Sequence, residues 1–229
     1  MSNQFSRTEL LIGKDGVEKL QNAKVAVFGI GGVGSYVVEA LARAGIGHLI
    51  IVDYDKYDVT NINRQLGAAH STIGKYKVDV MRDRILDISP IARVEAYRPD
   101  EIESGETSLI NSSLTYVVDA IDTMANKMQL IEKCKKEDVK IITVTGAGNK
   151  LDATGFEVSD IYRTSICPVC KILRKELKKR NIKDLKVVYS KEIPKKLDNG
   201  DRTLGSISFV PSVAGLIAAG EVIKDIISC

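Results

Sequence analysis

The chain has 229 residues, of which 44% are apolar and 28% are charged, so it can bury a hydrophobic core of ordinary size. This composition excludes disordered and fibrous proteins. The formal net charge of +3 is too small to indicate a polyanionic partner by itself. Four cysteines and the lack of a leader-like apolar segment near Met1 favour a cytoplasmic protein. The most apolar stretch, residues 207–227, carries too many polar groups for a membrane span.

The predicted elements begin with an N-terminal arm over residues 1–22, in which Gly13 and Gly16 interrupt short helical patterns. From residue 23 to 150, short β-branched runs alternate with amphipathic stretches, as is typical of parallel βαβ units. The strands predicted in this core are 24–28, 48–53, 93–97, 115–119 and 139–145.

In residues 151–229 the short β-branched runs no longer alternate regularly with amphipathic stretches, which predicts an α+β extension rather than more βαβ units. Its predicted strands are 155–158, 186–189 and 206–209, and its predicted helices are 168–180 and 212–227. The fold class we expect is therefore α/β, with a Rossmann-like, doubly wound, mainly parallel sheet and this C-terminal extension, in a single domain.

A glycine-rich loop joins the first predicted strand to the first helix of the core. The loop reads Gly29-Ile-Gly31-Gly32-Val-Gly34, a G-x-G-x-x-G motif in the strand–turn–helix context that the motif requires. Such glycines let backbone N–H groups approach phosphate oxygens at the helix N-terminus. Asp53 ends the second strand, where its carboxylate can accept hydrogen bonds from ribose hydroxyls. At this point an NAD-dependent enzyme and an ATP-binding enzyme both fit.

The residues that follow the second strand favour a triphosphate over a dinucleotide. Two cations and two amides lie near the glycine loop in the sequence, and cations can neutralise charge on an α-phosphate and on departing pyrophosphate. Together with a further acid they are Asp55, Asn61, Arg64, Gln65 and Lys77. Asp122 follows the fourth strand, and a single carboxylate beside substrate phosphates is enough to hold Mg²⁺. ATP and Mg²⁺ are therefore the expected ligands.

These segments give the chain a resemblance to the ThiF/MoeB/HesA superfamily of ubiquitin-activating-like adenylating enzymes. The resemblance rests on the glycine loop and on the runs 5–8, 44–47, 53–55, 60–65, 74–77 and 119–122. It implies that Asp53 binds ribose, that Asp122 holds the metal, and that the phosphates are bound by Asn61, Arg64, Gln65 and Lys77. Arg7 resembles the arginine that reaches into the active site of a partner subunit, which implies a homodimer. By the same resemblance, residues 1–229 form one ThiF-type adenylating domain, with a nucleotide-binding core over 23–150 and a substrate-binding extension over 151–229.

The chain departs from many relatives in two places. The acid at 122 is followed by Thr123, and Lys127 stands where relatives carry an arginine, so only a cation is carried over there. Relatives that activate sulfur carriers typically hold structural zinc with two Cys-x-x-Cys pairs, whereas this chain has the single pair Cys167 and Cys170. Because a closed zinc site needs four ligands, we expect these sulfurs to pack as small apolar groups. A zinc ion shared between subunits is the alternative.

Within the superfamily, the chain is most similar to the branch of tRNA threonylcarbamoyladenosine dehydratases, through the segments 145–149, 152–160, 171–180 and 204–215. The resemblance implies that ATP adenylates the carboxylate of the threonylcarbamoyl group, after which a nucleophile of the same modification displaces AMP and closes a ring. Because the substrate supplies this nucleophile, no catalytic cysteine is needed. The catalytic residues implied are Arg7, Arg64, Lys77 and Asp122. The alternative activity is adenylation of the C-terminus of a ubiquitin-like sulfur carrier, with a sulfur-transfer protein as partner.

A basic run in the extension is the candidate surface for tRNA phosphates. We call residues 171–180 the basic segment; its predicted nucleic-acid-binding residues are Lys171, Arg174, Lys175, Lys178, Lys179 and Arg180. Taken alone, such a run most often forms a solvated helix face. With tRNA as the expected substrate, the run instead predicts salt-dependent binding to the RNA backbone.

Overall fold

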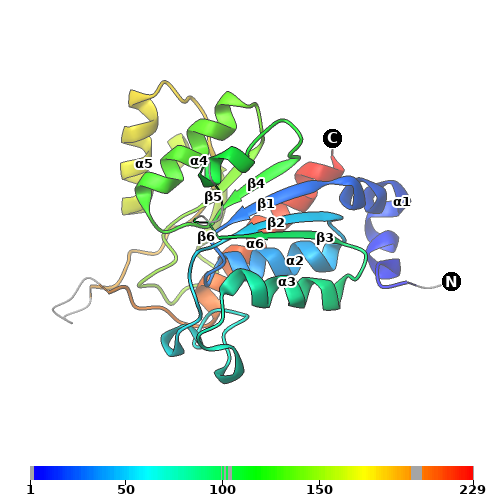
Figure 1. Cartoon of the computed structure of the whole chain (residues 1–229). Helices are drawn as coiled ribbons and strands as arrows, with labels where there is room; N and C mark the ends of the chain where they lie inside the picture. The colour runs from blue at the N-terminus through cyan, green and yellow to red at the C-terminus, as the bar shows by residue number, and fades with distance from the viewer. Residues whose placement is uncertain (1–2, 99, 101, 103–104, 197–202, 229) are drawn as a thin grey trace.

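The fold is an α/β sandwich built on one seven-stranded sheet. A computed structural model describes residues 3–98, 100, 102, 105–196 and 203–228 (Figure 1). The strands are β1 (Lys24–Phe28), β2 (His48–Val52), β3 (Arg93–Tyr97), β4 (Tyr116–Asp119), β5 (Ile141–Val144), β6 (Phe156–Asp160) and β7 (Lys186–Ser190). The α-helices are α1 (Ser6–Asn22), α2 (Gly34–Ala44), α3 (Lys77–Ile88), α4 (Met124–Lys136), α5 (Pro168–Lys179) and α6 (Phe209–Ile227).

The strand order is β3-β2-β1-β4-β5-β7-β6, with every neighbouring pair parallel except β6 and β7. The order reverses between β1 and β4, which is the arrangement of a doubly wound sheet. The predicted fold class is thus confirmed. The C-terminal extension adds β7 and β6 to the same sheet, because β7 pairs with β5 and β6 returns antiparallel as the edge strand.

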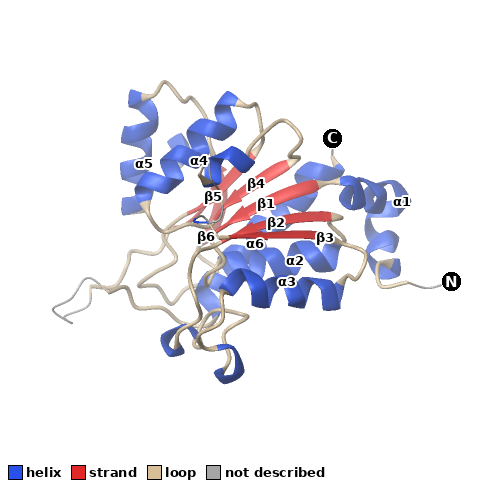
Figure 2. Ribbon diagram, viewed as in Figure 1, coloured by secondary structure: helices blue, strands red, loops and turns tan. Residues whose placement is uncertain are grey.

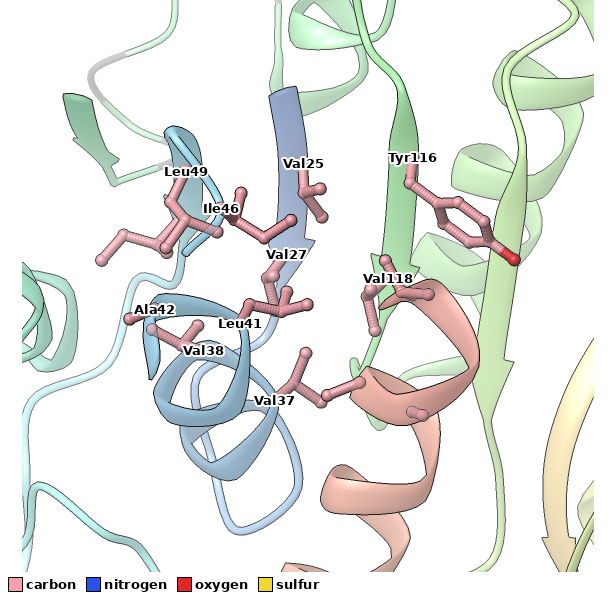
Figure 3. Packing of buried hydrophobic residues seen from close by; sticks show 14 of the residues in the cluster. Val25, Val27, Val37, Val38, Leu41, Ala42, Ile46, Leu49, Tyr116 and Val118 are labelled. Atoms are coloured by element: carbon pink, nitrogen blue, oxygen red, sulfur yellow. The ribbon is translucent and has the colours of Figure 1, made fainter. Parts of the chain in front are cut away.

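Helices cover both faces of the sheet, so each face has its own apolar core (Figure 2). On one face α2 packs against β1 and β4, where Val37 and Leu41 meet Val27 and Val118 (Figure 3). Helix α6 packs beside α2 on this face. On the other face α4 and α5 bury their apolar sides against β4, β5 and β7. Strands buried on both faces explain the unbroken β-branched runs of the core.

Two elements differ from the predictions. Residues 206–209 are not a strand; they lead directly into α6, which begins at Phe209. The arm is one helix, α1, kinked at Gly13, whose φ of 74° lies in the left-handed region. The second half of α1 is docked, since Val17 and Leu20 are buried in the core. The first half leaves Leu10 and Leu11 almost fully exposed.

A buried ion pair joins β4, α4 and β5. Lys127 of α4 lies 3.1 Å from each carboxylate oxygen of Asp119, the last residue of β4, and it also donates to the carbonyl of Val144 at 3.0 Å. Both side chains are almost fully buried. Asp119 also accepts from the N–H of Ile121, so the pair shapes the turn that carries Asp122. Lys127, for which the resemblance implied only a cation, is therefore a residue that supports the fold.

Removing one partner of this pair should make the protein markedly less stable. We expect Lys127→Ala to lower the free energy of unfolding by about 3–5 kcal/mol, because it leaves the Asp119 carboxylate buried without a counter-ion. The double variant Asp119→Leu with Lys127→Met should lose much less, since it removes both charges. Urea unfolding measures these changes. Lys136→Ala, which changes an exposed residue of the same helix, is the control. If Lys127→Ala and Lys136→Ala lowered the free energy of unfolding equally, the structural role of the Lys127–Asp119 pair would be contradicted.

Candidate nucleotide site

A cavity of about 650 Å³ opens where the carboxyl ends of β1, β2 and β4 meet. This is the position at which doubly wound sheets bind ligands, because the strand order reverses there. Ten of the residues predicted to bind the nucleotide or the metal line it: Gly29, Gly31, Gly32, Asp53, Asp55, Asn61, Arg64, Gln65, Lys77 and Asp122. The remaining two predicted site residues of the core and arm, Gly34 and Arg7, do not.

The glycine loop is packed so closely that side chains have no room at two positions. Gly29 has a φ of 86°, and a Cβ there would come within 2.7 Å of the Ala120 carbonyl oxygen. A Cβ at Gly34 would come within 1.7 Å of the Gly29 carbonyl oxygen. By contrast, the space beside Gly31 is open apart from the Gln65 amide at 3.8 Å. The loop therefore brings backbone and the N-terminus of α2 to the cavity, as a phosphate site requires.

Asp53 holds the glycine loop to the end of β2. Its carboxylate accepts from the N–H of Ile30 at 2.6 Å and from the N–H of Asp55 at 2.8 Å. Burial raises the pKa of Asp53, and the Lys77 ammonium and the two backbone donors oppose that rise. Each carboxylate oxygen keeps a second lone pair, so the side chain can still accept from a ribose hydroxyl.

The two predicted cations have protein partners in this state. Lys77, the first residue of α3, is buried and lies 2.7 Å from Asp55 and 3.8 Å from Asp53. Arg64 donates to the Thr60 carbonyl and to the Asn63 side chain, both at 2.8 Å. Both cations line the cavity, so a bound polyanion can exchange with these partners at little desolvation cost.

The two predicted amides differ in what they leave available. Asn61 accepts from the N–H of Asp58, which closes a capping box on the short 3₁₀ helix η1 (Val59–Asn61). Gln65 is 7% exposed, and its side-chain oxygen has no hydrogen-bond partner among the described residues. An orphaned buried amide in a cavity wall indicates that a ligand completes its hydrogen bonding.

Asp122, which follows β4 by three residues, is one of three exposed acids that line the cavity, together with Asp55 and Asp58. The described residues contain no group of three or more His, Cys, Asp or Glu side chains able to hold a metal by themselves. This donor set fits Mg²⁺ bound by one carboxylate, waters and substrate phosphates, and it does not fit a metal held by protein alone.

Several cavity residues were not predicted. Tyr54, Lys56 and Asp58 interleave with predicted ones in the run after β2, so the run itself carried the signal. Glu106 and Asn126 have no such signal, because their sequence neighbours show no motif. Burial raises the pKa of Glu106, and the nearby Asp119 carboxylate adds to the rise.

Two segments that are distant in sequence form the remaining wall. Ala147 and Gly148, after β5, line the cavity together with residues 203–206, before α6. Asn149 joins them, because its N–H donates to the Gly205 carbonyl at 2.8 Å and its side chain accepts from the Gly205 N–H at 2.6 Å. Both segments were singled out as branch-specific in the sequence, and the fold brings them together.

Arg7 lies far from the cavity of its own chain. Helix α1 lies beside the amino ends of the strands, and Phe5 packs against Gly45 there, whereas the cavity is at the carboxyl ends (Figure 1). Arg7 is exposed. Within one chain the structure therefore does not bring Arg7 together with the other predicted catalytic residues.

The basic segment, which lies on α5 and the residue after it, contains exposed lysines and cations that pair with acids; among the exposed lysines, Lys178 also lies over the Tyr162 ring, 5.9 Å from its centroid. Lys171, Lys175 and Lys178 are exposed at the spacing i, i+4, i+7, which places them on one face of α5. Lys179 and Arg180 pair with Glu176, whose pKa they lower to about 2, and Arg180 also pairs with Glu132.

Arg174 points inward. It donates to the backbone carbonyl of Thr164 at 3.0 Å and also to the Thr164 hydroxyl. Arg174 thus differs from the exposed lysines of the segment, because a residue at the border of the apolar face of α5 can reach backbone acceptors, and its contact with nucleic acid stays a prediction.

None of the helices that the structure describes combines the length and the apolar character needed to cross a bilayer.

Comparison with known proteins assigns the family. The model of the ThiF family matches residues 5–229. The tRNA threonylcarbamoyladenosine dehydratase of Bacillus subtilis (strain 168) is 43% identical over 243 residues, covering 99% of this chain and 96% of the relative. The structure is similar to that of the E. coli tRNA N6-threonylcarbamoyladenosine dehydratase in complex with ATP, with a TM-score of 0.86, 33% identity and coverage of 98% of this chain and 94% of that one. The molybdopterin-synthase adenylyltransferase of Salmonella typhimurium is 32% identical over 142 residues, covering 61% of this chain and 57% of the relative. The chain belongs to the ThiF family.

Proposed function

We propose that this protein uses ATP to dehydrate the threonylcarbamoyl group of N6-threonylcarbamoyladenosine in tRNA, through an adenylated carboxylate. The single observation that carries the proposal is the cavity, in which the glycine loop, the cations Arg64 and Lys77 and the exposed acid Asp122 converge. The near full-length similarity to the B. subtilis dehydratase supports this substrate over a sulfur carrier, because the similarity to the molybdopterin-synthase enzyme covers only 61% of the chain.

In the first step, a carboxylate oxygen of the substrate attacks the α-phosphorus of ATP, and the bond to pyrophosphate breaks. Negative charge grows on the α-phosphate and on the departing pyrophosphate. Arg64 and Lys77 leave their present partners and stabilise that charge. The glycine loop and the Gln65 amide hold the phosphates, while Asp53 and Asp55 orient the ribose.

In the second step, a nucleophilic atom of the same modification attacks the activated carbonyl carbon, loses its proton and displaces AMP. The products are the cyclic nucleoside, AMP and pyrophosphate, so the elements of one water leave the nucleoside. The attacking atom is tethered, which gives it a high effective concentration, and the protein needs only to orient it and exclude water.

Asp122 would hold Mg²⁺, which supplies charge neutralisation at the triphosphate when bound. We further propose that Arg7 acts in the cavity of a second copy of the chain, in a homodimer, because it lies at the opposite end of its own sheet. In this reading the whole chain is one adenylating unit of the cytoplasm, with nucleotide contacts from residues 23–150 and substrate contacts from 151–229. The exposed lysines of the basic segment would contact tRNA phosphates.

The activity is tested by incubating the protein with ATP, Mg²⁺ and threonylcarbamoylated tRNA, then measuring the masses of the digested nucleosides by mass spectrometry. The expected product is lighter by one water and forms together with AMP. Retention of the open nucleoside would refute the proposed function. Pyrophosphate exchange that depends on a small protein ending in Gly-Gly would instead support the sulfur-carrier alternative.

Replacing the charged residues of the cavity should stop chemistry without loss of RNA binding. We expect Arg64→Ala and Asp122→Ala each to lower kcat at least about a hundredfold, because each removes a group that stabilises charge in the transition state. The dissociation constant for tRNA should change by no more than about twofold, because changes at distant, independent sites have little effect on each other's binding free energy. Asp87→Ala, an exposed acid of α3 outside the cavity, is the control. Weakened tRNA binding with unchanged kcat would contradict these roles.

The exposed lysines of α5, which are Lys171, Lys175 and Lys178, should control the salt dependence of tRNA binding. Replacing Lys171, Lys175 and Lys178 together with alanine should flatten the slope of log affinity against log salt by about 2–3, roughly one for each lost phosphate contact. Filter binding across a salt series measures the slope. Alanine at Lys14, Lys136 and Lys224, which lie on other helices, provides a comparison that removes the same three charges. An unchanged slope in the triple variant refutes the surface.

A further inference from the structure

Two cysteines at the start of α5 lie together just outside the nucleotide cavity. Cys167 is the residue that precedes α5, Pro168 is the first residue of the helix, and Cys170 lies in the first turn. Both side chains are buried, and both sulfurs face the hydroxyl of Thr145, which lies 3.2 Å from the Cys170 sulfur and 3.9 Å from the Cys167 sulfur. The mechanism proposed above does not use this pair.

Both sulfurs belong to the apolar core beneath α5, but they also have polar contacts, and these contacts affect the two thiols differently. The Cys170 thiol donates to the Cys167 sulfur; this bond, with backbone N–H groups of the helix start and the Thr145 hydroxyl, lowers the pKa of Cys167 to about 5. The same bond, together with burial, raises the pKa of Cys170. The buried ammonium of Lys150 adds a favourable charge near both sulfurs. Two thiols that differ in this way are typical of a Cys-x-x-Cys pair whose first sulfur is a nucleophile.

The backbone before the pair is strained. Ile166 has a φ of 63°, and a β-branched residue in the left-handed region is a rare and costly conformation. The N–H of Cys167 donates to the Ser165 carbonyl at 2.5 Å, which tightens the turn further. Ile166 is 53% exposed, so apolar burial does not explain the conformation. This turn places Cys167 at the start of the helix and beside the Thr145 hydroxyl.

Two other interpretations account for less. A structural zinc needs four ligands, and the described residues place no third His, Cys, Asp or Glu beside the pair. Apolar packing explains the burial of the sulfurs but not their shared hydroxyl, the nearby ammonium or the strained turn. Cys134 shows what an apolar site does instead, since burial raises its pKa to about 12.

We infer that Cys167 and Cys170 are a redox-active dithiol that exchanges with small disulfides and closes into an internal disulfide. The Cys167 thiolate attacks one sulfur of a glutathione-type disulfide, forms a mixed disulfide and releases one thiolate. Cys170 then loses its proton and attacks the Cys167 sulfur, which releases the second thiol. Two protein thiols are oxidised and one small disulfide is reduced to two thiols. In a reducing compartment, protein disulfides are usually of this transient kind.

The pair lies against the wall of the cavity. Gly146 has a φ of 62°, and a Cβ there would come within 2.9 Å of the Cys167 sulfur. The next two residues, Ala147 and Gly148, line the cavity. Closing the disulfide pulls the Cys167 sulfur toward Cys170 and changes this contact, so we expect oxidation to alter ATP affinity. This consequence rests on the proposed nucleotide site, whereas the formation of the disulfide does not.

The redox test uses the full chain in glutathione buffers that run from fully reduced to fully oxidised. After acid trapping and alkylation, the peptide that contains both cysteines should lose the mass of two hydrogens and regain it with dithiothreitol. Cys170→Ser should trap glutathione on Cys167, whereas Cys167→Ser should leave Cys170 unmodified. Cys134→Ser is the control and should behave as the unaltered protein does. Circular dichroism checks the fold of each variant.

Full alkylation of both cysteines in the oxidised buffer would overturn the inference. So would stoichiometric zinc in the purified protein, or equal trapping of glutathione in the two single variants. For the cavity, ATP dissociation constants of the reduced and oxidised protein should differ by about fivefold or more. Equal constants would overturn the link to the cavity, and the Cys167→Ser variant, which cannot form the bond, should not respond to oxidant.

Discussion

The close approach of the glycine loop to the turn after β4 is the constraint on which the site depends. Gly29 lies so near the Ala120 carbonyl that any side chain would collide with it, and Gly34 lies equally near the backbone of Gly29. Since Ala120 also donates its N–H to Phe28 at the end of β1, the two strands end in register. This packing brings the N-terminus of α2 and the turn that carries Asp122 to one cavity. Backbone contacts thus place the proposed phosphate site beside the acid that we propose binds Mg²⁺.

Charge in this cavity is balanced before any ligand arrives. Lys77 is paired with Asp55, and Arg64 is held by oxygens of its own loop, so neither cation is left buried and alone. A lone buried charge would cost several kcal/mol, whereas a polyanion replaces these partners with stronger ones. The same reasoning applies to Lys127, with the opposite outcome. Its three acceptors are buried and fixed, so that cation supports the turn instead of the substrate.

The features that could be predicted from the sequence are those set by residues close together along the chain. The glycine loop, the acid at the end of β2 and the cations after it follow from motif and spacing, and they line the cavity as expected. What could not be predicted depends on distant partners. Arg174 looks like any other cation of α5 until the fold brings Thr164 beside it. The strand expected over 206–209 has suitable residues, but this segment pairs with neither edge strand of the sheet, β3 or β6; it lies between the cavity wall at Ser206 and the start of α6.

The C-terminal extension is more closely bound to the nucleotide site than its different sequence pattern suggests. Its strands continue the sheet of the core, its last helix packs beside α2, and Pro211 of that helix lies 3.3 Å from the position of a Cβ on Gly32. Asn149 fixes the segment before α6 through two hydrogen bonds to the backbone of Gly205, one from its own N–H and one accepted by its side-chain oxygen. A substrate held by the extension is therefore held by the same rigid body that holds the phosphates. The attack on the α-phosphorus and the later attack on the activated carbonyl carbon both require the reacting atoms to be aligned within a fraction of an ångström. In the proposed mechanism, this shared scaffold lets a tethered nucleophile close a ring without a catalytic cysteine.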